Sequence, residues 1–278
     1  MEPNFSSLSS ALGVEVDGID LSRQLDRETV AELREAFSQH HLLLLRNQEI
    51  DEAAQMRFAT LFGPISHRGV FMKTRDFTHV SNAREDGILG GGVLDFHSDH
   101  TFFRHPLRAI CLYAIEVPGS GGETLFSNAA MAWANLPADL KARIQGRRSL
   151  QLFDYNGDYN RRCLERDAAA DAPRCWHPLM LHDKAGGTVL FVHPLTTAAI
   201  DDLSEPETDA LIDELAGYIA DPTIGYRHTW RPGDVLIWNN MALQHARTDF
   251  DPSERRTLRR MPIAVSEAEA RDETATAA

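Results

Sequence analysis

The C-terminal third of the sequence consists of short extended segments separated by turn residues, and this pattern limits the folds that the chain can adopt. Strands are predicted at 226–230, 235–238 and 257–265, with a Pro-Gly turn between the first two. A further run, "HLLLL" at 41–45, is typical of a strand that is buried on both faces. Many short strands favour a β-sandwich or a barrel.

Helices are expected around this β core. Residues 26–39 place apolar side chains on one face, and Asp26 can cap the first turn. A second helix begins near Asp51, and a third begins at the capping box formed by Ser204 and Glu207. The predicted fold class is therefore mainly β with peripheral helices (α+β).

No repeat or linker divides the chain, so we expect residues 1–265 to form one domain. The polar stretch 154–175 has the composition of an active-site lid, although a plain surface loop explains it equally well. The segment 266–278 lacks the apolar residues of a folded core and is predicted to be a disordered tail.

The formal charge of −13 argues against general affinity for nucleic acid or for anionic membranes. The longest aliphatic run covers 42–45, whereas about 20 apolar residues are needed to span a bilayer. The first ten residues show no secretory signal, and the three cysteines form no CxxC pair. We therefore expect a cytoplasmic protein with reduced thiols and with neither a nucleic-acid nor a membrane partner.

The stretch "LDFHSDHTFFRHP" at 94–106 contains a candidate metal motif. His97 and Asp99 lie two residues apart, so on an extended backbone both side chains project from one face and can reach one ion. With 12 histidines in the chain, about one such motif is expected by chance, and a solvated loop is the alternative. His245, which follows the predicted strand at 235–238, is the candidate third ligand. Two histidines and one carboxylate on one face of an octahedron are the arrangement of non-haem Fe(II) oxygenases. We assign His100 and His105 to surroundings of the site or to the surface.

Arginines at fixed spacing follow the third candidate ligand. Arg256 and Arg260 share one face of the predicted strand, while Arg255 and Arg259 share the other. We expect one face to be buried and the other to be wet. A buried arginine pair needs an anion, and a carboxylate held bidentately is the natural partner. A solvated basic strand is the alternative.

Thr124 follows the turn "GSGG" at 119–122 and offers a hydroxyl to the carboxylate that Arg256 would bind. An ordinary β-forming threonine is the alternative.

The chain resembles the taurine dioxygenase and dichlorophenoxyacetate dioxygenase (TauD/TfdA) family of Fe(II)- and 2-oxoglutarate-dependent enzymes from about residue 10 to 265. "LGVEVDGIDLSRQL" is similar to the opening segment of that family, and "LLLLRNQEIDEAAQMRFATLFGPI" to its next strand and helix. "FHSDHTF", "GGETLFSN" and the H-x10-R-x3-R spacing match its functional motifs in order.

This resemblance implies a double-stranded β-helix (a cupin-like jelly roll) and a homodimer or homotetramer. It implies Fe(II) bound by His97, Asp99 and His245. It also implies 2-oxoglutarate as cosubstrate, with its distal carboxylate held by Thr124 and Arg256, and Arg260 beside the cosubstrate or the substrate anion. The expected reaction uses O₂, releases succinate and CO₂, and hydroxylates an unactivated C–H bond.

The expected substrate is a small anion: a carboxylate, an amino acid or a sulfonate. By comparison with the family, His67 or Arg68 would meet its charge together with Arg260. The other candidate substrate residues are Phe102, Phe153, Tyr155 and His193.

Three departures from the family pattern argue against taurine itself. The family's W-D-N-R reads "WNNM" at 238–241, Phe96 replaces the tryptophan before the first metal ligand, and glycines occupy 90–92. Two rival hypotheses are a non-oxidative His/Asp metal-binding jelly roll and a zinc hydrolase, neither of which needs Thr124 and the two arginines at these spacings.

Overall fold

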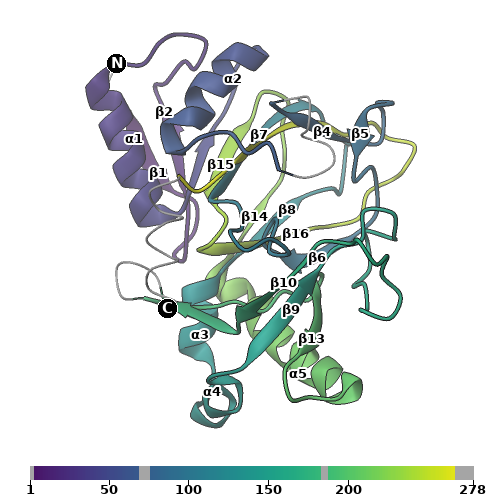
Figure 1. Ribbon diagram of the computed structural model, residues 1–278. Coiled ribbons are helices and arrows are strands. Elements are labelled where there is room, and N and C mark those ends of the chain that lie inside the picture. Colours follow the sequence, from purple (N-terminus) through teal and green to yellow (C-terminus); the bar gives the residue numbers. More distant parts are fainter. Residues whose placement is uncertain (1–2, 69–75, 183–186, 267–278) are drawn as a thin grey trace.

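The computed structural model describes residues 3–68, 76–182 and 187–266, in which two β-sheets lie at the centre of the molecule (Figure 1). The larger sheet runs in spatial order through β1 (Asn4–Ser7), β2 (Val14–Asp17), β3 (Leu42–Leu45), β15 (Val235–Asn239), β7 (Ala109–Glu116), β17 (Thr257–Ile263), β4 (Thr78–Ser81) and β5 (Gly87–Ile88). The smaller sheet runs through β14 (Gly225–His228), β8 (Thr124–Asn128), β16 (Leu243–Arg247) and β6 (Leu94–His97). The strands predicted from the C-terminal third are therefore present as β14, β15 and β17.

The two sheets pack face to face through one apolar cluster. Leu44, Ile110 and Leu236 enter it from the larger sheet, and Phe126 and Leu243 enter it from the smaller sheet. Each of these side chains is at most 1% exposed. The sandwich expected from the strand pattern is thus held by contacts between residues far apart in sequence.

The four leucines of β3 explain why that run carries no polar residue. Leu42 and Leu44 point into the cluster between the sheets, whereas Leu43 and Leu45 belong to a second cluster on the opposite face. All four are 0% exposed. Burying one leucine contributes roughly 2 kcal/mol relative to leaving it in water, so β3 anchors both layers, as predicted for a strand buried on both faces.

Five α-helices are assigned in the described residues, and they pack outside the two sheets (Figure 1). Helices α1 and α2 cover the outer face of the larger sheet, while α3, α4 and α5 pack together beyond the smaller sheet, at the other end of the molecule. Their bounds are α1 (Arg27–His40), α2 (Glu52–Ala59), α3 (Ala129–Asn135), α4 (Ala138–Ile144) and α5 (Glu205–Ile219), and two 3₁₀ turns cover Thr60–Phe62 and Pro222–Ile224.

The helix starts expected from sequence are confirmed. Asp26 accepts a hydrogen bond from the backbone N–H of Thr29 at 2.8 Å, and Asp51 does the same for Ala54 at 2.8 Å. The capping box joins the Ser204 backbone N–H to Glu207 at 2.8 Å. These caps satisfy backbone donors that the first turn of a helix leaves unpaired.

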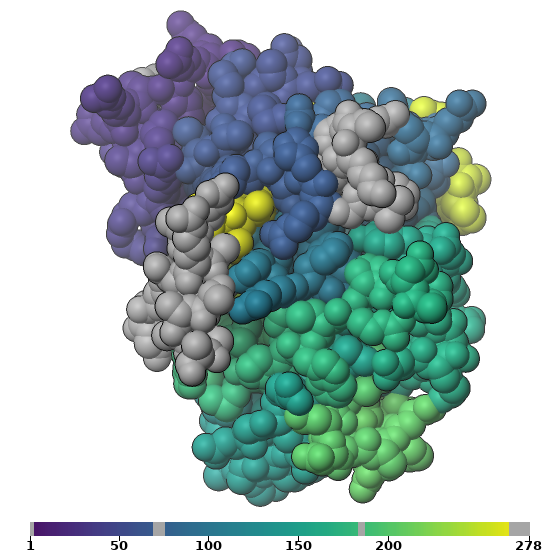
Figure 2. Space-filling model, in the orientation of Figure 1, coloured from purple at the N-terminus to yellow at the C-terminus, as the bar shows by residue number. Residues whose placement is uncertain are grey.

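Two further small sheets were not expected from the sequence. They are β10 (Arg174–Pro178), β9 (Arg148–Leu152) and β13 (Thr197–Ile200), and the pair β11 (Met180–His182) and β12 (Thr188–Leu190). The segment 154–173 carries turns but neither helix nor strand, and the expected tail falls outside the described residues apart from Ser266. In the space-filling view, the N-terminal residues and the middle of the chain occupy opposite ends of the surface (Figure 2).

The expectation that one face of β17 would be wet is wrong. Arg255 is exposed, but Arg259 is only 6% exposed, because β17 lies between β7 and β4 and helix α2 covers its other face. The Arg259 guanidinium donates from Nε to Gln55 Oε1 at 2.6 Å and from Nη2 to the Ile50 carbonyl at 3.1 Å. It also lies over the Tyr113 ring, 5.0 Å from the centroid.

We therefore expect Arg259→Met to lower the free energy of unfolding by about 2–4 kcal/mol, because the buried oxygens of Gln55 and Ile50 lose their donor. Urea unfolding measures the change. Arg143→Met is the matched control, since Arg143 forms an exposed ion pair with Glu214 and its loss is expected to cost less than about 1 kcal/mol. Equal stability of the two variants would contradict this role for Arg259.

Candidate active site

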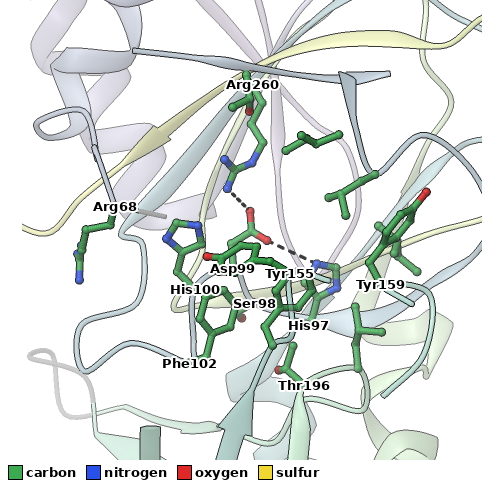
Figure 3. Close-up of a pocket in the computed structure, with 16 residues that line it drawn as sticks. Arg68, His97, Ser98, Asp99, His100, Phe102, Tyr155, Tyr159, Thr196 and Arg260 are labelled. Carbon is green, nitrogen blue, oxygen red and sulfur yellow. Dashed lines mark hydrogen bonds and ion pairs between the residues drawn. The ribbon is translucent and has the colours of Figure 1, made fainter. Parts of the chain in front are cut away.

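The three candidate metal ligands meet where β6 pairs with β16. His97 and His245 are direct cross-strand partners, so their rings lie side by side with centroids 4.2 Å apart. Asp99 follows β6 and reaches back, with its Oδ1 3.5 Å from His97 Nε2 (Figure 3). The same oxygen lies 4.0 Å from His245 Nε2. One donor atom from each residue lies within 4.8 Å of the other two. The structure thus brings together two imidazoles and one carboxylate whose donor atoms can surround one ion.

The electrostatic surroundings keep His245 neutral and Asp99 ionised. Burial, together with the neighbouring His97, lowers the pKa of His245 to about 3, so its imidazole is neutral at pH 7. Burial alone would raise the pKa of Asp99, but the Arg260 guanidinium and the two imidazoles hold it well below its usual range. His97 Nδ1 is 2.7 Å from the Asp95 carbonyl, which leaves Nε2 to face the carboxylate.

Asn240, which sequence reasoning singled out only as part of a departure from the family pattern, fixes the backbone of Asp99. Its Oδ1 accepts from the Asp99 backbone N–H at 2.8 Å, and its Nδ2 donates to the Asp99 carbonyl at 3.0 Å. Nδ2 also donates to the Leu107 carbonyl at 2.8 Å, and the side chain is 0% exposed. The Asn240 side chain therefore supplies the two backbone hydrogen bonds that a neighbouring strand would otherwise give to Asp99. No sequence signal separates this asparagine from its neighbour Asn239.

Arg260 connects the carboxylate to the larger sheet. It lies on β17, and its Nη2 donates to Asp99 Oδ2 at 2.5 Å (Figure 3). Its side chain is 9% exposed. Arg260 and Asp99 both line a cavity, which is described below. The negative charge of Asp99 is therefore balanced inside the protein by a cation from the other sheet.

Thr124 lies on β8, the strand that pairs with β16, and neither Thr124 nor Arg256 lines the cavity. Thr124 Oγ1 accepts from Trp230 Nε1 at 3.0 Å, and Arg256 Nε donates to the Gly122 carbonyl at 3.3 Å. Gly122 has φ +66°, and a Cβ there would lie 3.1 Å from Arg256 Nε, so a side chain would crowd the guanidinium. Burial lowers the pKa of Arg256 to about 9, with Arg247 as the second cause, so Arg256 is still a cation at pH 7.

Beside the ligands lies a cavity of about 80 Å³. Arg68, Phe102, Phe153, Tyr155 and Arg260, all candidates from the sequence, line it. The Phe102 and Phe153 rings stack with centroids 5.2 Å apart, and Tyr155 meets Phe153 edge-on at 5.1 Å. The cavity therefore has an aromatic wall, with the Arg260 guanidinium beside the Asp99 carboxylate (Figure 3).

Two candidates from the sequence lie elsewhere. The His67 side chain is 61% exposed and lies 3.7 Å from Asp76. His193 is 0% exposed, outside the cavity lining, and packs edge-on against Phe191 at 4.5 Å. A contact of either histidine with substrate stays a prediction.

His100 is a cavity residue whose role the sequence did not predict. It lies beside Asp99 with φ +61°, a left-handed conformation that non-glycine residues seldom adopt. Its Nδ1 is buried without a hydrogen-bond partner among the described residues. Burial lowers the pKa of His100 to about 4, with Arg260 as the second cause, so the ring is neutral at pH 7. The sequence feature that could have indicated this place in the cavity is that His100 directly follows the predicted ligand Asp99.

The family model described as "Taurine catabolism dioxygenase TauD, TfdA family" matches residues 4–261. The chain belongs to this family. It is 28% identical to pentalenolactone F synthase of Streptomyces avermitilis, covering 91% of this chain and 90% of that protein. It is also 28% identical to the 2,4-dichlorophenoxyacetate dioxygenase of a Burkholderia species, with 88% and 89% covered. A solved taurine dioxygenase from Burkholderia xenovorans superposes with a TM-score of 0.79 at 26% identity, covering 96% of this chain and 90% of that one.

Membership of the TauD/TfdA family confirms the jelly-roll fold and the enzyme class. The chain is an oxidoreductase, an Fe(II)- and 2-oxoglutarate-dependent dioxygenase that uses O₂. The family match disfavours the zinc hydrolase and the non-oxidative metal-binding protein.

We expect Asn240→Ala to weaken Mn(II) binding about 10- to 100-fold, because partners that orient a ligand usually contribute that much to metal affinity. Calorimetric titration with Mn(II), which is stable in air, measures the dissociation constant. Asn239→Ala is the control, because Asn239 Oδ1 accepts from the Met241 and Ala242 backbone N–H groups and not from Asp99. Unchanged affinity in a folded Asn240→Ala protein would contradict the orienting role.

Proposed function

We propose that this enzyme hydroxylates an unactivated C–H bond of a small anion that has an apolar body, and that it converts 2-oxoglutarate and O₂ to succinate and CO₂ in the same turnover. The observation that carries this proposal is one cavity that contains both the Asp99 carboxylate and Arg260 beside an aromatic wall. A charged group and a hydrocarbon surface within one small cavity match a substrate with the same two parts.

His97, Asp99 and His245 would hold the ferrous ion. The donor set fits this metal, because two neutral imidazoles and one carboxylate are the ligands that non-haem Fe(II) oxygenases use. When bound, the ion supplies the activation of O₂ that the side chains cannot supply themselves. The presence of Asp99 supports hydroxylation rather than halogenation, since halogenating relatives lack the carboxylate ligand. The protein's own task is to hold both reactants and to exclude water.

Arg256 and Thr124 would bind the distal carboxylate of 2-oxoglutarate. Arg256 is 3% exposed. Of the three nitrogens of its guanidinium, only Nε forms a hydrogen bond to another described residue. A buried cation without an anion is costly, so an incoming carboxylate supplies the missing charge. Thr124, which is 4% exposed, offers its hydroxyl hydrogen because Oγ1 only accepts from Trp230.

Arg260 and Arg68 would bind the substrate anion, with the aromatic residues around its body. Arg68 Nη1 donates to the His105 carbonyl at 2.7 Å and the guanidinium lies 5.9 Å from the Phe103 ring centre, so its position is fixed. The neutral His100 adds one ring nitrogen that can meet a polar group of the substrate. Relatives named for phenoxypropionate and for sulfate esters, at 28% and 27% identity, support an anionic substrate.

The test is succinate release in the presence of Fe(II) and 2-oxoglutarate. The panel is 2,4-dichlorophenoxyacetate, (S)-phenoxypropionate, dodecyl sulfate, taurine and free amino acids. We expect the two aryloxy acids to stimulate release more than taurine, because taurine has no aromatic group that could pack against Phe102 and Phe153. No succinate from any member, with Asp99→Ala as background, would contradict the proposed reaction.

Arg256→Met is expected to raise the KM for 2-oxoglutarate at least about 30-fold, the effect of losing 2 kcal/mol or more from a buried charge pair. The measurement is succinate release against 2-oxoglutarate concentration. Arg255→Met is the control, because Arg255 is exposed and pairs with Glu116 at 2.7 Å. Equal KM values for the two variants would contradict the assignment of Arg256.

Two sequence-based expectations stay predictions: a cytoplasmic location and a homodimer or homotetramer. In the described residues, no helix is both long and apolar enough to cross a membrane.

A further inference from the structure

Arg247 lies inside the protein and binds three backbone carbonyls of one loop. It is the last residue of β16 and is 4% exposed. Nε donates to the Gly92 carbonyl at 2.9 Å, Nη1 to the Leu89 carbonyl at 2.5 Å and Nη2 to the Gly91 carbonyl at 2.5 Å. The planar guanidinium carries five N–H donors in a fixed arrangement. One side chain therefore holds the loop 89–92 at three points.

The loop has little conformational preference of its own. Three of its four residues are glycine, which loses more conformational freedom on ordering than any other residue. Leu89 has φ +51° and Gly92 has φ +78°, so the backbone turns through the left-handed region at both ends. This course directs the three carbonyls toward one point. The guanidinium at that point is what holds them there.

The same loop forms one wall of the cavity. Ile88 and Leu89 line it together with Asp99 and Arg260. On the side away from Arg247, the Gly91 backbone N–H donates to Tyr159 Oη at 3.3 Å. Tyr159 also lines the cavity (Figure 3). Fixing the loop therefore positions Leu89, and next to it Ile88 of β5, as well as an aromatic ring from the segment 154–173.

A second contact joins that segment to the loop. In the amide orientation that gives both of its polar atoms suitable partners, Asn160 Nδ2 donates to the Gly91 and Val93 carbonyls at 3.1 Å each. A Cβ on Gly92 would lie 2.9 Å from the Asn160 amide, so glycine is required for this approach. Tyr159 and Asn160 thus form hydrogen bonds to the same stretch of backbone that Arg247 holds.

Arg247 is also tied to the metal and cosubstrate residues. It follows His245 by two positions on β16 and pairs with Leu94 of β6. The positions of His245 and Arg247 therefore both depend on the pairing of β16 with β6. The guanidinium carbon of Arg247 lies 6.0 Å from the centre of the Phe250 ring, and that of Arg256 lies 5.9 Å from it. The residue that holds the loop and the residue that would bind 2-oxoglutarate therefore contact the same aromatic ring.

We propose that Arg247 is a positioning residue for substrate selection: by holding the carbonyls of Leu89, Gly91 and Gly92, it sets the wall that meets the apolar body of the substrate. The inference rests on the proposed function, because the wall selects a substrate only if one binds in this cavity. Lysine cannot replace arginine fully, since one ammonium group cannot reach three carbonyls in a fixed plane.

The first test measures the loop without any turnover. Hydrogen–deuterium exchange is followed by mass spectrometry in the full chain loaded with Mn(II) and 2-oxoglutarate. In Arg247→Met, we expect exchange in peptides covering 87–94 to accelerate about tenfold or more, with Arg247→Lys between this variant and the wild type. Exchange in β8 is expected to stay unchanged. Arg255→Met is the control, and it should match the wild type throughout.

Tyr159→Phe gives a test that does not depend on how well Arg247 variants fold. It removes only the hydroxyl that accepts from Gly91, so we expect faster exchange at 87–94 with an unchanged unfolding midpoint. Unaltered exchange at 87–94 in both Arg247→Met and Tyr159→Phe would overturn the proposal. Acceleration of β8 as large as that of the loop would also overturn it, because Arg247 would then act on general stability.

The second test separates selection from chemistry. With 2,4-dichlorophenoxyacetate, or with the panel compound that releases most succinate, we expect Arg247→Lys to raise the substrate KM about tenfold and to change the KM for 2-oxoglutarate less than about twofold. Equal rises in both constants would overturn the proposal. If no compound releases succinate, the proposed function fails while the exchange experiment still decides the role of Arg247.

Discussion

The negative charge of Asp99 has to be kept inside the protein, beside two imidazoles that must remain neutral. Arg260 balances this charge at 2.5 Å, and Asn240 fixes the backbone of the same residue through two hydrogen bonds. Neither partner is near Asp99 in sequence: one comes from the larger sheet, and the other follows the strand β15. Since a buried carboxylate is stable only with such partners, the packing of the two sheets is what makes the site possible.

Strand β16 brings the separate tasks of the site together. His245 points toward the other ligands, and two positions later Arg247 holds the glycine loop. The guanidinium groups of Arg247 and Arg256 both lie over the ring of Phe250. The metal residues, the cosubstrate residues and the cavity wall are therefore neighbours through one short segment. A change in the pairing of β6 with β16 would disturb all three.

Features that depend on local spacing could be predicted from the sequence. The caps at Asp26 and Asp51 and the buried leucines of β3 need no knowledge of distant contacts. The short H-x-D spacing does bring His97 and Asp99 together, but Asp99 lies in the turn after β6 and not on an extended strand. Arg259 shows the limit of this reasoning. Alternation along β17 placed it correctly on the face opposite Arg260, but only the tertiary structure shows that helix α2 covers that face. Asn240 and Arg247 were missed for the same reason, since their partners are backbone groups about 140 to 160 residues away.

We propose one site in which His97, Asp99 and His245 hold one ferrous ion and Arg256 holds one 2-oxoglutarate beside it. Anaerobic titration of the protein with Fe(II) and 2-oxoglutarate, followed by visible absorption, tests it most directly. We predict a weak charge-transfer band that appears only when both are present and saturates at one equivalent of each per chain. A folded protein that shows no such band, or a band that persists undiminished when Asp99 is replaced by alanine, would contradict the account.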